Sequence, residues 1–157
     1  MRPHNNVLPR PVNMVTLKMV REKKLGYKKP ITQSEDAIEL VRSLFKNNFR
    51  EIVIVIGLDN ANRPTAVHTV SLGSPNQAPV PISSVFKPLL LSNATAFILL
   101  HNHTASSLVP SPADKELTER LKTIGQQLEI SMLDHLILNA DGSDFYSFWT
   151  HRYENKT

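Results

Sequence analysis

Apolar residues recur along the sequence with two different spacings. Nearly continuous or alternating apolar residues are typical of strands, and they predict strands at residues 15–19, 51–58, 65–72, 95–100, 133–138 and 144–149. Apolar residues three to four positions apart are typical of amphipathic helices, and they predict helices at residues 33–47, 82–92 and 111–128. The order of these segments predicts one mixed α/β domain, a curved sheet with helices packed on it.

Two of these segments carry further local signals. The run Glu51-Ile-Val-Ile-Val-Ile-Gly-Leu58 is rich in β-branched residues and almost wholly apolar, which is typical of a central strand covered on both faces. The turn-forming residues 59–64 follow it and predict a hairpin with the strand at 65–72. At the start of the first helix, Thr32 and Glu35 have the spacing of a capping box.

Composition limits the class of protein. A chain of 157 residues, 41% hydrophobic and 20% charged, is expected to form one soluble domain with a single core. Cysteine is absent, which excludes disulfides and thiolate ligands, and any metal must be held by His, Asp or Glu. No apolar run approaches the roughly 18 residues of a membrane span, and none reads as a secretory signal. We therefore expect a cytoplasmic protein with no membrane partner.

Basic residues are concentrated at the start of the chain. Residues 1–30 hold eight Lys and Arg and one Glu, a net charge of +7 out of a chain total of +4, so the other residues carry −3. We expect a basic, partly irregular arm at residues 1–30 and a folded domain at residues 31–157. The arm predicts contact with nucleic acid through its phosphates, and a solubilising leader is the alternative.

Two histidines stand where a predicted buried strand ends. His101 and His103 follow the apolar run Phe97-Ile-Leu-Leu100, and residues two apart on an extended chain point to the same side. Their rings can therefore converge on one ion beside an open loop, where catalytic groups are often placed. Two loop histidines without a shared partner are the alternative.

Ser111 and Asp114 open the helix that follows. Ser-x-x-Asp with Pro112 at the first helical position is a capping arrangement, in which Asp114 also favours the positive end of the helix dipole. Capping alone explains both residues. It also fixes the direction of the Asp114 side chain, and the loop after His103 is short enough to fold back, so Asp114 is a candidate metal ligand as well.

These residue types suit a catalytic zinc. Two imidazole nitrogens and one carboxylate commonly bind it and leave a fourth position for water, whose pKa the ion lowers. A further carboxylate is then needed as general base. Glu51 is the candidate, because it begins an otherwise apolar strand, where a charge is costly without a partner. A solvated strand end beside Arg50 is the alternative.

The spacing His-x-His, seven residues, then Ser-x-x-Asp, with a Glu on an earlier strand, resembles the JAMM (MPN-type) zinc metallopeptidase motif. The chain is most similar to the RadC-like branch, over roughly residues 30–150. The stretches that carry the similarity are Ala94–His103, Pro110–Asp114 and Leu133–Leu138. The resemblance implies the JAMM/MPN, cytidine deaminase-like fold, a curved mixed sheet flanked by helices.

The resemblance also implies a role for each motif residue. His101, His103 and Asp114 would bind zinc. Glu51 would take a proton from the attacking water and pass it to the leaving amine, and Ser111 would donate a hydrogen bond to the oxyanion. The implied activity is zinc-dependent hydrolysis of a protein or peptide substrate, of the peptidase or isopeptidase kind.

The chain departs from the RadC pattern in one loop. That branch has His-Asn-His-Pro-Ser-Gly-Asp, whereas Thr104-Ala-Ser-Ser107 follows the second histidine here, so a Pro, a Gly and an acid are absent. The set of expected ligands is complete. The helix-hairpin-helix segment that precedes the domain in full RadC proteins has no match in residues 1–30. We therefore do not expect these residues to bind duplex DNA as that segment does.

Two other functions stay open. A DNA-repair or nucleic-acid-associated accessory protein would use the fold as a scaffold and the basic arm for binding, and an idle domain would serve protein contacts only. His68, on the predicted partner strand of Glu51, is expected to be an ordinary strand residue, and an approach to the site is the alternative. Asn102 is expected to shape the turn. Asp134-His135 begins a predicted strand, and His135 is expected to be a structural hydrogen-bonding residue, with a place behind the metal ligands as the alternative.

Overall fold

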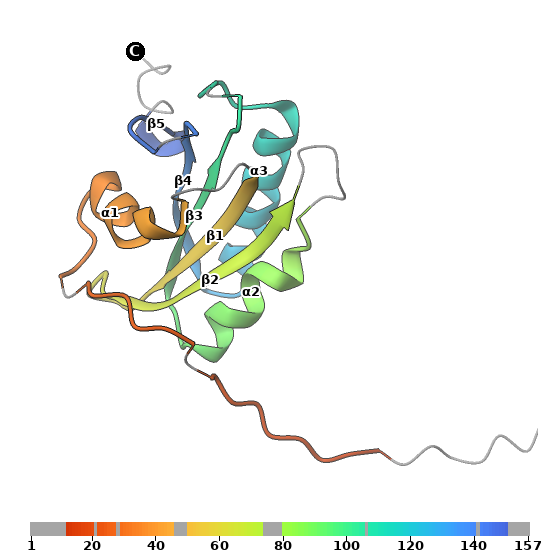
Figure 1. Cartoon of the computed structure of the whole chain (residues 1–157). Coiled ribbons are helices and arrows are strands. Elements are labelled where there is room, and N and C mark those ends of the chain that lie inside the picture. Colours follow the sequence, from red (N-terminus) through yellow and green to blue (C-terminus); the bar gives the residue numbers. More distant parts are fainter. Residues whose placement is uncertain are drawn as a thin grey trace, which may run out of the picture.

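The computed structural model describes residues 12–20, 22–27, 29–45, 50–73, 80–105, 107–140 and 142–150. Within these ranges the helices are α1 (Ser34–Phe45), α2 (Ile82–Leu91) and α3 (Pro112–Gln127). The strands are β1 (Glu51–Leu58), β2 (Pro64–Gly73), β3 (Ala96–Asn102), β4 (Ser131–Leu138) and β5 (Phe145–Ser147). They form one sheet in the order β2-β1-β3-β4-β5, so the mixed α/β fold predicted from the sequence is confirmed (Figure 1).

The sheet is mixed because one of its connections is a crossover. β1 pairs antiparallel with β2 and with β3, and β4 pairs antiparallel with β5. β3 and β4 are parallel, and parallel neighbours cannot be joined by a tight turn. Helix α3 supplies the crossover, so the chain that leaves the carboxyl end of β3 passes through residues 103–111 into a helix packed on the same sheet.

Helices cover both faces of the sheet (Figure 1). One buried cluster joins α1 to alternate residues of the strands, among them Ile52, Ile54 and Leu100. The other joins α2 and α3 to the residues between them, among them Phe97 and Leu99. Side chains alternate along a strand, so the next residue of β3 in line with Leu99 is His101, which faces α3.

The strand expected at residues 15–19 is not formed. Residues 12–20 have no regular secondary structure and run away from the sheet (Figure 1). Val15 and Leu17 are each 74% exposed. In the described residues, the neighbour of β2 in the sheet is β1 and no strand lies beyond it. Alternation alone therefore did not create a strand, because the segment has no backbone partner.

The start of the first helix also differs from the prediction. The backbone N–H and the hydroxyl of Thr32 both donate to Asp36 Oδ2, at 3.0 and 2.9 Å. The pairing of Thr32 with Glu35 is wrong, because α1 begins at Ser34 and the carboxylate that reaches back is one position further along. Asp36 is 5% exposed, and it also lies 2.9 Å from Lys29 Nζ.

The last strand is shorter than residues 144–149. β5 ends at Ser147, and residues 148–150 are helical. Asp134 Oδ2 accepts a hydrogen bond of 2.7 Å from the Ser147 hydroxyl, and Asp134 Oδ1 accepts one of 3.1 Å from Trp149 N–H. This half-buried carboxylate on β4 holds the chain as it leaves the strand, a contact that no local pattern could indicate.

Candidate metal centre

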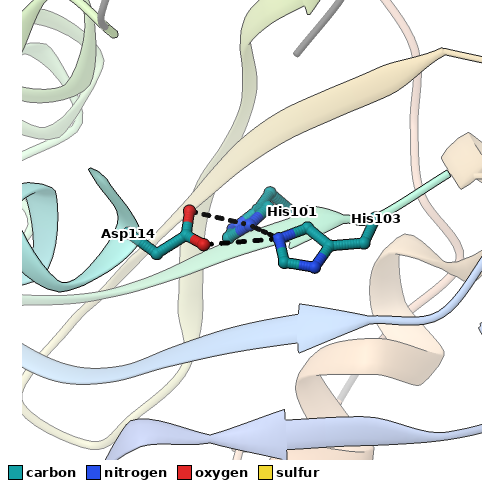
Figure 2. A group of neighbouring side chains, drawn as sticks. All are labelled: His101, His103 and Asp114. Carbon is teal, nitrogen blue, oxygen red and sulfur yellow. Dashed lines mark hydrogen bonds and ion pairs between the residues drawn. The ribbon is translucent and has the colours of Figure 1, made fainter. Parts of the chain in front are cut away.

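The three predicted ligands come from two elements that meet at the carboxyl end of β3. His101 lies in β3 and is 6% exposed, and His103 follows directly after the strand. Asp114 is in the first turn of α3, and its backbone N–H donates to Ser111 Oγ at 3.1 Å while its carboxylate accepts from Ser111 N–H at 2.8 Å. The predicted capping arrangement is confirmed, and it turns the Asp114 carboxylate toward the two rings (Figure 2).

The ligand atoms lie at distances that suit a single ion. His101 Nε2 is 2.9 Å from His103 Nε2 and 3.2 Å from Asp114 Oδ1, and His103 Nε2 is 3.4 Å from Asp114 Oδ2 (Figure 2). Two ligand atoms that each lie about 2.0–2.1 Å from a tetrahedral zinc are about 3.3 Å apart. The separations of 2.9 and 3.2 Å from His101 Nε2 are close to two edges of such a tetrahedron, and one ligand atom from each residue lies within 4.8 Å of the others, so these residues fit a metal ion.

The ring of His103 is fixed with a free nitrogen toward the centre. Its Nδ1 lies 2.7 Å from the carbonyl oxygen of Ser107. A carbonyl can only accept, so Nδ1 carries the hydrogen, and the neutral ring has an unprotonated Nε2. The partner is a backbone atom, and the loss of the RadC-type acid at position 107 therefore leaves this contact in place.

The Asp114 carboxyl is held in its ionised form. The side chain is half-buried, which by itself opposes ionisation, but the His101 ring 3.2 Å away and two hydrogen bonds from Ser111 outweigh this and keep the pKa of Asp114 well below its ordinary value. Hydrogen bonds to the charged form of an acid stabilise it. A carboxylate and the ring nitrogens thus converge on one point, where only a cation or a shared proton satisfies all of them.

Glu51 lies on the sheet face that carries His101. Val53 of β1 is paired with His101 of β3. Glu51 lies two residues before Val53 in the same strand, so it is on the same face of the sheet. Its carboxylate is not a member of the His-His-Asp group, whose ligand atoms lie within 4.8 Å of one another.

Asn102 fixes the backbone on both sides of Glu51. Its Oδ1 accepts a hydrogen bond of 2.8 Å from Ile52 N–H, and its Nδ2 donates to the Arg50 carbonyl at 3.2 Å. Asn102 is fully buried. Its side chain therefore points away from the histidines that flank it and ties the end of β3 to the start of β1. No local sequence pattern predicts this contact, because fifty residues separate Asn102 from Ile52.

Ser111, the N-cap of α3, is hydrogen-bonded to the Asp114 carboxylate. Its hydroxyl donates to Asp114 Oδ2 at 2.6 Å. His68 is exposed on β2 opposite Val55, and it is not part of the ligand group.

Thr118 and His135 lie on the Nδ1 side of the His101 ring, opposite the nitrogen that faces the Asp114 carboxylate. His135 was predicted from the sequence as a hydrogen-bonding residue, and Thr118 was not. His101 Nδ1 is 2.8 Å from His135 Nε2, and His135 Nδ1 is 2.7 Å from Thr118 Oγ1. Both residues also line a cavity of about 410 Å³ between α3, β4 and residues 146–149, whose lining includes none of the three ligands. Thr118 stands four residues after Asp114, one helical turn, and that spacing is the one sequence signal that could have pointed to it.

A mixed sheet covered on both faces, with a His-His-Asp group at the carboxyl end of a strand, defines an α/β domain with a candidate metal centre. The family model for the RadC-like JAB domain matches residues 31–153. The chain therefore belongs to the RadC-like JAB domain family, and the resemblance stated from its motifs is confirmed.

Curated relatives agree with this assignment. A UPF0758 protein of Flavobacterium johnsoniae is 37% identical over 120 residues, which cover 76% of this chain and 52% of the relative. UPF0758 proteins of Histophilus somni and Trichlorobacter lovleyi are 36% and 40% identical, over 73% and 66% of this chain and 51% and 44% of their own lengths. The chain spans about half the length of these relatives, and their shared name states no activity. Among the described residues, no helix has the length and apolar character needed to cross a membrane.

Proposed function

We propose that this chain is a zinc-dependent hydrolase that cleaves an amide bond in a protein or peptide substrate. The observation that carries the proposal is the close group of His101 Nε2, His103 Nε2 and the Asp114 carboxylate. The two nitrogens are 2.9 Å apart, His101 Nε2 lies 3.2 Å from Oδ1, and His103 Nε2 lies 3.4 Å from Oδ2. Imidazole nitrogens with one carboxylate suit zinc, and JAB domains often bind it. Three protein ligands leave one position of a tetrahedral ion open, as in catalytic sites.

Asp114 would bind through Oδ1, because Oδ2 already accepts hydrogen bonds from the backbone and the hydroxyl of Ser111. When bound, zinc would supply a Lewis acid that polarises the substrate carbonyl and lowers the pKa of a coordinated water. His103 and Asp114 are held in place by Ser107 and Ser111, so the chain presents its ligands without rearranging them.

Glu51 would be the general base of the reaction. It is half-buried on the same sheet face as His101, and Asn102 holds the peptide groups on either side of it. A carboxylate there would take the proton of the attacking water and deliver it to the leaving amine. Ser111 would donate its hydroxyl to the oxyanion, for which the hydroxyl must turn away from Asp114 Oδ2.

Elemental analysis of the purified chain, after zinc loading and removal of free metal, tests the centre. We expect about one zinc per chain in the wild type and in Glu51→Gln, and its loss in His101→Ala and Asp114→Ala, because one ligand is removed in each. Glu116→Gln, on the exposed side of α3, is the matched control and should behave as the wild type.

Turnover is measured on a pool of fluorescence-quenched peptides that contain both linear and lysine-linked isopeptide bonds. Glu51→Gln should lower the rate by about 10²–10⁴-fold while it retains zinc, which is the contribution typical of a general base. A wild type that binds no zinc, or equal rates for zinc-loaded wild type and Glu51→Gln, would contradict the proposal.

A further inference from the structure

A series of polar contacts leads from the backbone of Asp114 through Thr118, His135 and His101 to the Asp114 carboxylate. Thr118 Oγ1 lies 2.6 Å from the carbonyl oxygen of Asp114, one turn earlier in α3, and 2.7 Å from His135 Nδ1. His135 Nε2 lies 2.8 Å from His101 Nδ1, and His101 Nε2 faces the Asp114 carboxylate at 3.2 Å. Thr118, His135 and His101 are 8%, 1% and 6% exposed, so water has little access to compete for these bonds.

The direction of each bond follows from its fixed end. The Asp114 carbonyl can only accept, so the single hydroxyl hydrogen of Thr118 is directed at it. Thr118 Oγ1 then has only lone pairs to offer His135, and His135 Nδ1 must donate to it. His135 is 1% exposed, and its two ring nitrogens contact a hydroxyl and another imidazole rather than a carboxylate, so the ring is neutral and carries one N–H only.

The remaining nitrogen of His135 is therefore an acceptor. It receives the Nδ1–H of His101, which leaves His101 Nε2 without a hydrogen where it faces Asp114 and His103. We propose that Thr118 and His135 are positioning residues of the metal centre, and that they select the tautomer of His101 whose Nε2 lone pair is free for the ion. The inference rests on the proposed metal centre for its purpose, but the tautomer can be measured without metal.

Removal of the Thr118 hydroxyl would reverse the order of these bonds. In Thr118→Val the Nδ1–H of His135 loses its acceptor, and the ring gains by moving its hydrogen to Nε2, where His101 Nδ1 can accept it. The hydrogen of His101 must then lie on Nε2, directed at the centre. Orienting partners of this kind typically change metal affinity by about 10–100-fold.

Two measurements on the full chain test the proposal. Long-range ¹H–¹⁵N spectra of metal-free protein at about pH 8, above the ordinary pKa of histidine, report which ring nitrogen carries the hydrogen. We expect Nδ1–H in His101 and His135 of the wild type and Thr118→Ser, and Nε2–H in Thr118→Val. Competition for zinc with a chromophoric chelator should show that Thr118→Val binds zinc at least about 10-fold more weakly than the wild type. Thr118→Ser should have nearly the wild-type affinity.

Thr123→Val is the matched control. Its hydroxyl also donates to the carbonyl four residues earlier, Glu119, at 2.9 Å on the same helix, but at an exposed position away from the histidines. It should leave the spectra and the zinc affinity unchanged. Chemical unfolding of each metal-free variant reports packing separately, because Val has nearly the shape of Thr.

The proposal is overturned if Thr118→Val keeps the wild-type tautomer of His101. It is overturned equally if Thr118→Ser weakens zinc binding as much as Thr118→Val does, since the hydroxyl is then not the cause. A wild type with the expected tautomers but no affinity for zinc would refute the metal centre and leave the selection of the tautomer standing.

Discussion

At the scale of single residues, a few buried polar side chains decide how the candidate site is built. Asn102 lies between the two histidines in the sequence, yet its side chain is fully buried and bonds to the backbone on both sides of Glu51. Residues alternate between the two faces along β3, so the end of this strand presents the two candidate metal ligands on one face and the Asn102 side chain on the other.

Asn102→Ala should lower the free energy of unfolding by about 1–3 kcal/mol, because Ile52 N–H would remain buried without its acceptor. Urea unfolding of the metal-free chain measures this, with Asn60→Ala in the exposed turn after β1 as the control. The variant should still bind zinc and should turn over more slowly, since Glu51 loses its backbone support. An unchanged free energy of unfolding would show that the hydrogen bonds of Asn102 do not stabilise the fold.

At the scale of elements, the close approach of α3 to the sheet sets where the ligands can meet. The chain reverses after α3, where Ile130 N–H donates to the Gly125 carbonyl at 2.8 Å and Glu129 has a φ of 58°. A Cβ on Gly125 would lie 2.5 Å from the Ile130 carbonyl oxygen and 3.2 Å from the ring of Phe97. Glycine is therefore required for this contact between helix and strand.

Gly125→Ala tests this requirement. On an exposed helix the change would gain about 1 kcal/mol in helix propensity, but here we expect a net loss of about 1–3 kcal/mol from overpacking against the backbone. Thermal or urea unfolding measures it, and Gln126→Ala, which is exposed in the same turn, should be nearly neutral. A stabilised Gly125→Ala would mean that the helix can move away from β4 at no cost.

At the scale of the whole molecule, acid sensitivity depends on carboxylates that hold segments together. Asp36 joins α1 to Thr32 and Lys29 in the segment before it, and its pKa is lowered to about 2, chiefly by the Thr32 backbone N–H and then by Lys29. A carboxyl with a lowered folded-state pKa stabilises the fold above its unfolded-state pKa and loses this effect as the pH falls. The loss from Asp36 falls between about pH 4 and pH 2.

Asp36→Asn should be less stable than the wild type at neutral pH and should approach it as the pH falls to about 2. Urea midpoints measured across this range give both curves, and Glu35→Gln, an exposed neighbour on the same turn, should follow the wild type throughout. Parallel curves for wild type and Asp36→Asn would exclude Asp36 as a source of the acid sensitivity.

The fold class and the meeting of His101, His103 and Asp114 were predictable because their signals are local. Apolar periods placed β1, β3 and α3, and the Ser111–Asp114 cap is an interaction between residues three apart. The same reliance on local pattern failed at residues 15–19, where alternation lacked a partner strand, and at Thr32, where a shift of one helical position exchanged Glu35 for Asp36.

The sequence by itself determined the three described helices, the strands β1 to β4, the cap of α3 and the residue types that can hold a metal ion. Only the tertiary structure decided which way their hydrogens point. His101 meets His135 across thirty-four residues, and Asn102 meets Ile52 across fifty, because neighbouring strands bring them together. Hydrogen-bond direction depends on the partner at the far end, here the backbone carbonyls of Ser107 and Asp114, and no pattern along the chain encodes a contact that the fold alone creates.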